Sequence, residues 1–265
     1  MKRKTKKGLF GRFIKTVFVL AVLAAIGFVG FYFVYPDVAK LKKQNPGKTS
    51  FMEYREKEWT QKGKKIKLQK KWVSLKYLSP YLVKAVIIAE DDKFWSHRGF
   101  DLDAIQKALE KDVEKGKFKF GGSTISQQLT KNLYLTPDKN PVRKLKEAII
   151  TWRIERALSK RRILEIYLNV VEWGEGIFGA ETASLHYFGK PAALLTAQEA
   201  ARLAVILPNP RKYRLDGSSR YVEKRARIIY GIMVRRGIVV PEYDEVLQQK
   251  DNGESPPTTE NNPQN

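Results

Sequence analysis

Glu90 stands in a sequence context that favours proton-transfer chemistry. It follows the largely apolar stretch 82–89 and begins a run of three acids that ends at Asp92. Burial raises the pKa of a carboxyl group and nearby lysines lower it, which is how proteins tune a general base. A solvated acidic turn, in which His97 packs or forms hydrogen bonds, also explains the pattern. This stretch alone leaves both interpretations open.

The segment GGSTISQQLTKN, residues 121–132, is polar and begins with two glycines. Thr124 and Gln127 have the spacing of a capping box, which predicts that a helix begins here. A helix N-terminus offers free N–H groups and a positive dipole end to a phosphate or sugar oxygen, and Lys131 lies about two turns further on. A capped helix with a polar, solvated face also explains the local pattern.

A third motif, RKLKE, places Arg143 and Glu147 four residues apart, on one face of a predicted helix. Such pairs are common, and alone this one indicates little. Together, however, the separated carboxylates of Glu90 and Glu147, the glycine-led helix start and several cations meet the needs of a reaction that displaces an anionic leaving group from a sugar. One acid would act as base while cations stabilise the departing charge. The cations are Lys131, Lys139, Arg143 and Lys144.

The composition limits the partners and cofactors of the chain. Its 265 residues are 43% hydrophobic, which is enough for a buried core. The formal net charge of +22 favours anionic partners: nucleic acid, phospholipid or a phosphate-bearing substrate. The absence of cysteine excludes disulfides and thiolate metal sites, and only two histidines do not favour a multi-histidine zinc site.

Residues 17–35, VFVLAVLAAIGFVGFYFVY, carry no charge and are long enough to cross a bilayer as a helix. The dense basic flank before them predicts a cytoplasmic N-terminus, with the rest of the chain outside. Lysines on the far side, such as Lys40 and Lys42, weaken this bias. A cleaved signal peptide is the rival interpretation, but the run is long for one and has no small-residue cleavage site before Pro36.

The pattern beyond the apolar run predicts mainly helices. Helices are expected over 101–115, from the Asn140-Pro141 pair onward, and from Thr196 toward Leu207, with at most a short strand at 64–68. The predicted organisation is a basic cytoplasmic segment (1–16), a transmembrane anchor (17–35), a juxtamembrane connector (36–70), a catalytic domain (71–240) and a disordered tail (241–265).

Over residues 72–215 the sequence resembles the peptidoglycan glycosyltransferases of the bacterial cell wall, and most closely the monofunctional biosynthetic transglycosylases. The resemblance rests on five motifs in the family's order and spacing: EDDKFWSHRGF, GGSTISQQLTKN, RKLKE, KRRILEIYLN and VEWGEGIFGAETASLHYFGK. It implies an all-α, lysozyme-like fold that meets the lipid surface. It also implies a reaction that joins lipid II to a growing glycan chain with inversion and releases undecaprenyl pyrophosphate.

The resemblance also assigns roles to residues. Glu90 would be the general base that deprotonates the acceptor 4-hydroxyl, and Glu147 the second acid, which positions groups or assists pyrophosphate departure. Asp91, Phe94 and His97 would shape the cleft. The substrate-contacting set would be Ser123, Thr124, Gln127, Gln128, Lys131, Asn132, Lys139, Arg143 and Lys144. Lys139 and Lys93 stand where relatives often carry arginine, so the bidentate geometry is lost there.

The expected partners are lipid II, the growing glycan, the membrane, and cell-wall synthesis or division proteins, but no nucleic acid. The expected location is the inner membrane, with a single pass and a periplasmic catalytic domain. The S-x-x-K and K-T-G motifs of transpeptidases are missing, so cross-linking is not expected. No cofactor or protein-built metal site is expected, although a Mg²⁺ or Mn²⁺ ion that bridges pyrophosphate would leave no strong sequence trace. The alternatives are a basic binding module, a lytic glycosidase and a wall-assembly scaffold.

Overall fold

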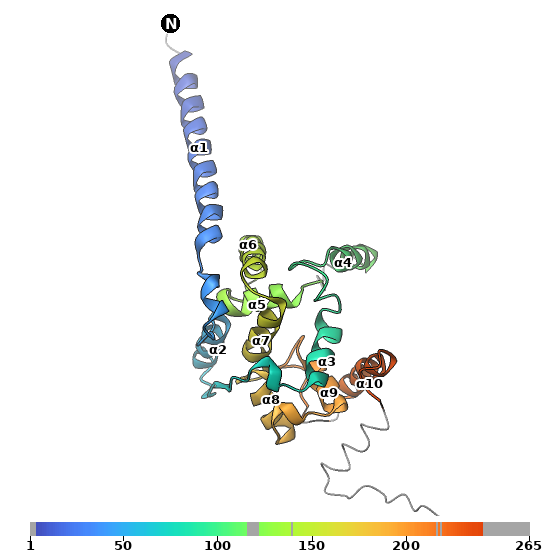
Figure 1. Ribbon diagram of the computed structural model, residues 1–265. Coiled ribbons are helices and arrows are strands. Elements are labelled where there is room, and N and C mark those ends of the chain that lie inside the picture. Colours follow the sequence, from blue (N-terminus) through green and yellow to red (C-terminus); the bar gives the residue numbers. More distant parts are fainter. Residues whose placement is uncertain (1–3, 116–121, 139, 216, 218, 241–265) are drawn as a thin grey trace, which may run out of the picture.

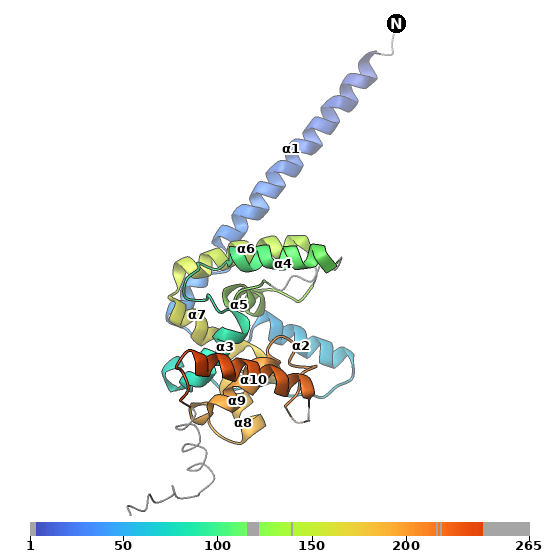
Figure 2. The same cartoon turned by 90° about the vertical axis from the view of Figure 1, so that its right-hand side faces the viewer.

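The computed structural model describes residues 4–115, 122–138, 140–215, 217 and 219–240, and these are mainly helical (Figure 1). One long helix, α1 (Lys4–Val34), projects away from the other elements, which pack together (Figures 1 and 2). The predicted all-helical class and N-terminal apolar helix are confirmed. Lys139 and the predicted tail 241–265 lie outside the described residues.

The elements after α1 include short 3₁₀ helices, written η, and three brief strands. In chain order they are η1 (Val38–Lys42), α2 (Ser50–Gln61), β1 (Gln69–Lys70), η2 (Leu75–Tyr77), α3 (Pro80–Glu90), α4 (Leu102–Lys115), α5 (Ile125–Tyr134), α6 (Pro141–Ala157), α7 (Lys160–Val170), β2 (Glu172–Gly174), β3 (Ile177–Phe178), α8 (Ala180–Phe188), η3 (Ala192–Leu194), α9 (Ala197–Ile206) and α10 (Arg220–Arg235).

Helix α1 is long and apolar enough to cross a membrane, with a mean hydropathy of 2.6 and none of its apolar window buried. It begins well before the apolar run, because the basic flank continues the same helix. Its C-terminal end rests on α6, where Arg153 donates to the backbone oxygens of Tyr32 (3.1 Å) and Val34 (2.7 Å). The guanidinium thus satisfies carbonyls that a helix end leaves without internal partners.

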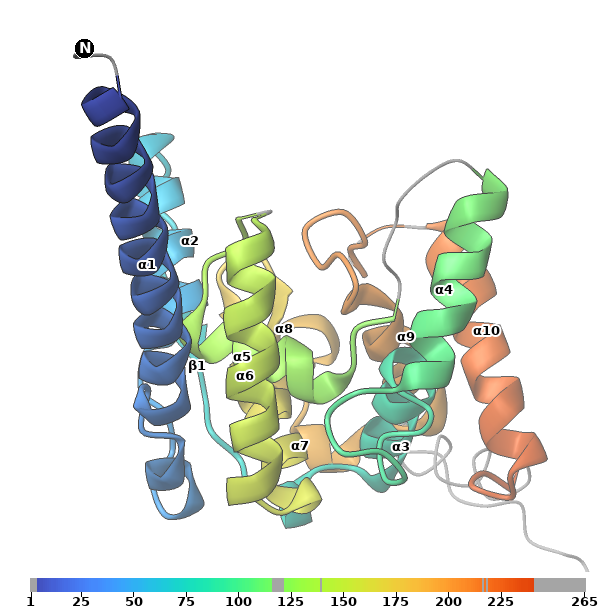
Figure 3. The ribbon, with the colours of Figure 1, turned by 90° about the horizontal axis from the view of Figure 1, so that it is seen from above.

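Two groups of helices form the folded body. Helix α3 packs against α9 and α10, and α5 packs against α6 and α7. Seen from above, the second group lies between α1 and the first group (Figure 3). The helices meet through side chains that are fully buried, such as Leu82 on α3 and Leu129 on α5. The end of α3, which carries Glu90, meets the beginning of α5, where Asp91 Oδ2 accepts a hydrogen bond from Ile125 N.

The helix boundaries follow the predicted local signals. The helix predicted over 101–115 is α4, and the three predicted N-caps are present. Thr124 and Gln127 form a complete capping box at α5, Thr196 and Glu199 form another at α9, and Asn140 accepts from Val142 N ahead of α6. Side-chain capping of this kind satisfies the free N–H groups of the first turn.

The strand expected at 64–68 is wrong in position. Instead, β1 lies just after it and pairs in parallel with β3, which pairs antiparallel with β2. The partner strand, rather than the local pattern, fixes this register. The turn into α8 needs Gly179, because its φ is +85° and a Cβ there would lie 2.9 Å from Asn169 O.

Candidate active site

Glu90, the last residue of α3, is held by one carboxylate oxygen. Gln128 Nε2 donates to Glu90 Oε2 at 2.8 Å, and Tyr167 Oη donates to Gln128 Oε1 at 2.9 Å. This chain of donors fixes the orientation of the Gln128 amide. Glu90 Oε1 is buried and has no hydrogen-bond partner among the described residues. The arrangement leaves that oxygen able to accept a proton.

Burial raises the pKa of Glu90, because an enclosed carboxylate loses its solvation in water. The hydrogen bond from Gln128 and the charge of Lys131 oppose this effect in part. Burial also holds the pKa of Tyr167 well above its ordinary value, so this phenol remains a donor at neutral pH. The surroundings therefore favour a carboxyl group that exchanges a proton nearer neutrality than an exposed glutamate would.

Lys131 follows Gln128 by one turn on α5 and lies in the field of both acids. Burial lowers its pKa, whereas the charges of Glu147 and Glu90 raise it. A half-buried ammonium in the field of two carboxylates can compensate negative charge that develops near Glu90. The predicted association of Glu90, Gln128 and Lys131 is thus present in the structure.

Glu147 lies in a different environment from Glu90. It is 3% exposed, but Arg143 Nη1 donates to its Oε2 at 2.6 Å and the ammonium of Lys144 contacts its Oε1. The predicted pairing of Arg143 with Glu147 across one helical turn is confirmed. Arg143 Nε also donates to Asp138 O. These contacts hold two cations at the first turn of α6, whose N-terminus adds positive potential.

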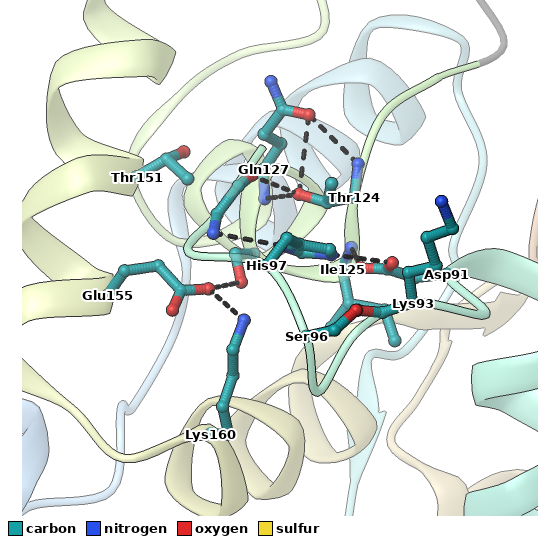
Figure 4. A network of polar contacts seen from close by, with 12 residues as sticks. Asp91, Lys93, Ser96, His97, Thr124, Ile125, Gln127, Thr151, Glu155 and Lys160 are labelled. Atoms are coloured by element: carbon teal, nitrogen blue, oxygen red, sulfur yellow. Dashed lines mark hydrogen bonds and ion pairs between the residues drawn. The ribbon is translucent and has the colours of Figure 1, made fainter. Parts of the chain in front are cut away.

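Asp91 ties the end of α3 to the start of α5. Its Oδ2 accepts from Ile125 N at 2.9 Å and its Oδ1 from His97 Nε2 at 2.8 Å, while His97 Nδ1 accepts from Gly99 N (Figure 4). Because Gly99 N–H donates to Nδ1, the proton of neutral His97 lies on Nε2. Phe94 is fully buried beside this pair. These contacts join the loop after α3 to the start of α5, and the role of the three residues in shaping a substrate cleft stays a prediction.

Part of the GGSTISQQLTKN motif serves the fold. Thr124 Oγ1 donates to Gly99 O at 2.7 Å, and both Thr124 and Gln127 are buried in the capping box. Asn132 is also buried and donates to Gln128 O. Ser123 is half-buried. The structure therefore brings Gln128 and Lys131 to Glu90, whereas Thr124, Gln127 and Asn132 position the helix that carries them.

Two neighbours of Glu90 were missed by sequence reasoning. Tyr167 belongs to the apolar stripe of α7, and its helical spacing indicated core packing alone. Arg225 on α10 lies close enough for its charge to lower the pKa of Glu90. No local signal distinguishes it from the other basic residues of that helix, because its proximity depends on the packing of α10 against α3.

The family model described as Transglycosylase matches residues 57–234. The chain belongs to the transglycosylase family. Several relatives are described as biosynthetic peptidoglycan transglycosylases. One from Nitrosospira multiformis is 44% identical over 229 residues, 86% of this chain and 99% of the relative. One from Azoarcus sp. (strain BH72) is 48% identical over 225 residues, 85% and 95% of the two chains. One from Dechloromonas aromatica is 51% identical over 189 residues, 71% and 82% of the two chains.

The transglycosylase domain supports a lysozyme-like helical fold and the activity of a peptidoglycan glycosyltransferase. All five predicted motifs lie inside the matched range. Among the residues that the structure describes, no group of three or more acidic or histidine side chains could hold a metal ion. The roles of individual residues and the use of a divalent cation stay predictions.

Proposed function

We propose that this transglycosylase polymerises lipid II into β-1,4-linked glycan and releases undecaprenyl pyrophosphate. The observation that carries the proposal is the buried Oε1 of Glu90, which has no hydrogen-bond partner among the described residues. The pKa of this side chain is raised, and Gln128 fixes its other oxygen. A base of this kind suits the deprotonation of a sugar hydroxyl, because its pKa lies nearer the working pH than that of an exposed glutamate.

In the proposed reaction, Glu90 Oε1 accepts the proton of the acceptor 4-hydroxyl. The resulting oxygen nucleophile forms a bond to the donor anomeric carbon as the bond from that carbon to pyrophosphate breaks. Attack from the face opposite the α-linked leaving group inverts the configuration. The departing pyrophosphate takes the bonding electron pair, so its negative charge grows. The cations Lys131, Arg143 and Lys144 stabilise this charge.

Glu147 has a supporting role in this proposal. Its ion pairs hold Arg143 and Lys144 at the start of α6, and its charge favours the ammonium form of Lys131 against burial. A carboxylate in that position keeps the cations in a defined arrangement before the substrate arrives. Preorganised charge of this kind lowers a barrier because it needs no rearrangement during the reaction.

We further propose that α1 is a single-pass anchor with a cytoplasmic N-terminus and a periplasmic catalytic domain. The support is its apolar, unburied surface and the basic residues at its start. Anchoring would keep the domain beside a lipid-linked substrate. Cell-wall synthesis or division proteins stay proposed partners. Peptide cross-linking and nucleic-acid binding are not part of the proposal.

The test is turnover of fluorescent lipid II by the full-length protein in phospholipid nanodiscs, with and without added Mg²⁺. We expect polymer that a muramidase digests, and loss of its formation in Glu90→Gln. A parallel reaction with preformed glycan distinguishes a lytic enzyme, which would shorten that polymer without consuming lipid II. Either that result or full activity of Glu90→Gln would contradict the proposal.

A further inference from the structure

A hollow of about 600 Å³ lies beside the loop that follows α3. None of Glu90, Gln128, Lys131 or Glu147 lines it. Its walls come from the loop between α3 and α4, from the C-terminal half of α6 and from the start of α7. The lining residues are Trp95, Ser96, His97, Arg98, Trp152, Glu155, Arg156, Leu158 and Lys160.

The hollow carries excess positive charge. Arg98, Arg156 and Lys160 line it, against the single carboxylate of Glu155. That carboxylate is 6% exposed, and its Oε1 accepts from Lys160 Nζ at 2.8 Å and from the hydroxyl of Ser126 (Figure 4). Among the described residues, neither Arg98 nor Arg156 has a carboxylate partner. Two exposed guanidinium groups therefore remain to bind an anion.

Two indoles flank these cations. Trp95 is 50% exposed and Trp152 is 42% exposed, although large apolar side chains are usually buried. The guanidinium of Arg156 lies 4.7 Å from the centre of the Trp152 ring. An apolar ring with a polar edge beside a cation is typical of residues at the boundary between lipid and water.

The position of the hollow relative to α1 also places it at the boundary between lipid and water. Trp152 packs against Phe33, with ring centres 5.7 Å apart, and the neighbouring Arg153 binds the last carbonyls of α1. Phe33 lies two residues before the end of the apolar run 17–35. If α1 spans the bilayer, Trp152 lies where the hydrocarbon ends and the headgroups begin.

We propose that this hollow binds the phosphate of an anionic phospholipid headgroup from the bilayer that holds α1. The inference rests on the proposed anchoring of the chain. Arg98 and Arg156 donate to the phosphate oxygens, Arg156 being braced by the Trp152 ring, and the two indoles contact the glycerol and upper acyl region. The bound lipid fixes the height and tilt of the domain above the membrane, and with it the approach of a lipid-linked substrate.

The test uses tryptophan fluorescence of the full-length protein in phosphatidylcholine nanodiscs. Two preparations are compared, one with a small amount of phosphatidylglycerol and the other with the same amount of phosphatidylcholine. In each, the added lipid carries a spin label on its headgroup. Of the five tryptophans, Trp59 and Trp173 are buried and Trp72 is packed against the core. The variant Trp95→Phe/Trp152→Phe measures the background quenching from those three.

We expect labelled phosphatidylglycerol to quench the unmodified protein more strongly than labelled phosphatidylcholine. In Arg98→Gln/Arg156→Gln the difference should fall by about tenfold or more, because each cation near an anionic surface contributes about fivefold to local enrichment. The matched control is Arg227→Gln/Arg235→Gln, which removes the same charge from α10, an element that packs against α3 and α9. The control should keep the full difference.

Equal quenching by the two labelled lipids in the unmodified protein would overturn the proposal. So would loss of the difference in the control, since the effect would then follow net charge alone. Binding of inorganic phosphate or pyrophosphate by calorimetry, without any quenching difference between the two labelled lipids, would show that the site takes a free anion rather than a lipid. Lipid II turnover in the same nanodiscs separates the two proposals. A preference for phosphatidylglycerol without turnover of lipid II would refute only the proposed reaction. Turnover without that preference would refute only the lipid site.

Discussion

Gln128 Nε2 donates to Glu90 Oε2 at 2.8 Å, while Glu90 Oε1 is buried with no partner among the described residues. The contact joins the end of α3 to the first turns of α5, two elements from different helix groups. A carboxylate that is fixed through one oxygen keeps the other in a defined direction. This asymmetry distinguishes Glu90 from Glu147, both of whose oxygens are paired.

Replacement of Glu90 by glutamine should remove activity without removing stability. General bases typically contribute about 10²- to 10⁴-fold to rate, so we expect a loss of that order in lipid II turnover. The amide oxygen of the new side chain can still accept from Gln128, and the desolvated charge is gone. Thermal denaturation should therefore show an equal or higher Tm.

The stability difference of this variant should depend on pH. The pKa of Glu90 is raised above its ordinary 4.5, so the folded state holds a proton that the unfolded state has released. The stability of the unmodified protein consequently falls as pH rises from the unfolded to the folded pKa. Glu90→Gln lacks this fall, and its advantage in Tm should grow with pH. A Tm difference that shrinks with rising pH would show that Glu90 is stabilised in its charged form.

Removal of the Gln128 amide should move the acidic limb of the pH–rate profile. The reaction needs ionised Glu90, so kcat/KM falls as pH drops through its raised pKa. Gln128→Ala removes a hydrogen bond that lowers this pKa, and the limb should shift to higher pH. Gln106→Ala on α4 is the control, since Gln106 bonds only to Glu110 at the surface in the described structure. An unchanged limb in Gln128→Ala would mean that another group controls it.

Short-range sequence signals predicted the helix caps and the ion pair within α6. They did not predict contacts between segments that are far apart in the sequence. The capping box of Thr124 and the pair of Arg143 with Glu147 depend on residues three or four apart, so the sequence contains them directly. The bond from Tyr167 to Gln128 joins residues 39 apart, and its existence depends on how α7 packs against α5. Sequence reasoning accordingly identified Gln128 as a site residue without its neighbour.

Replacement of Lys131 should affect the reaction more than folding. Burial lowers the pKa of this ammonium, which means that burying its charge disfavours folding. The charges of Glu147 and Glu90 act in the opposite direction and favour the ammonium form. We expect Lys131→Ala to reduce kcat strongly while Tm changes by no more than a typical surface substitution. Lys131→Arg restores the charge and should recover part of the rate. Collapse of stability with unchanged activity per folded molecule would exclude a role in stabilising the leaving group.

Glu147→Gln should lower stability, in contrast to Glu90→Gln. The carboxylate is buried but carries ion pairs to Arg143 and Lys144, and the amide leaves both cations without a counter-charge. Because Lys144 is half exposed, solvent reduces the penalty, and we expect a loss of about 1 to 3 kcal/mol in unfolding free energy by urea denaturation. The double variant Arg143→Gln/Glu147→Gln should recover part of this loss of stability, because it removes one of the two unpaired cations. Equal stability of all three proteins would mean that the ion pairs do not hold the start of α6.

Asp91→Asn should destabilise the junction between α3 and α5. Both Asp91 oxygens accept from N–H donors, Ile125 N and His97 Nε2, so an amide NH₂ must face one of them. A buried donor left without an acceptor costs about 1 to 3 kcal/mol, and Tm should fall accordingly.

In a double-mutant cycle with His97→Ala, residues in direct contact should show a coupling of about 0.5 to 3 kcal/mol. Additive effects would contradict the contact. Because Asp91 follows Glu90 directly, the variant should also lose activity per folded molecule, as the neighbouring carboxylate is displaced from Gln128.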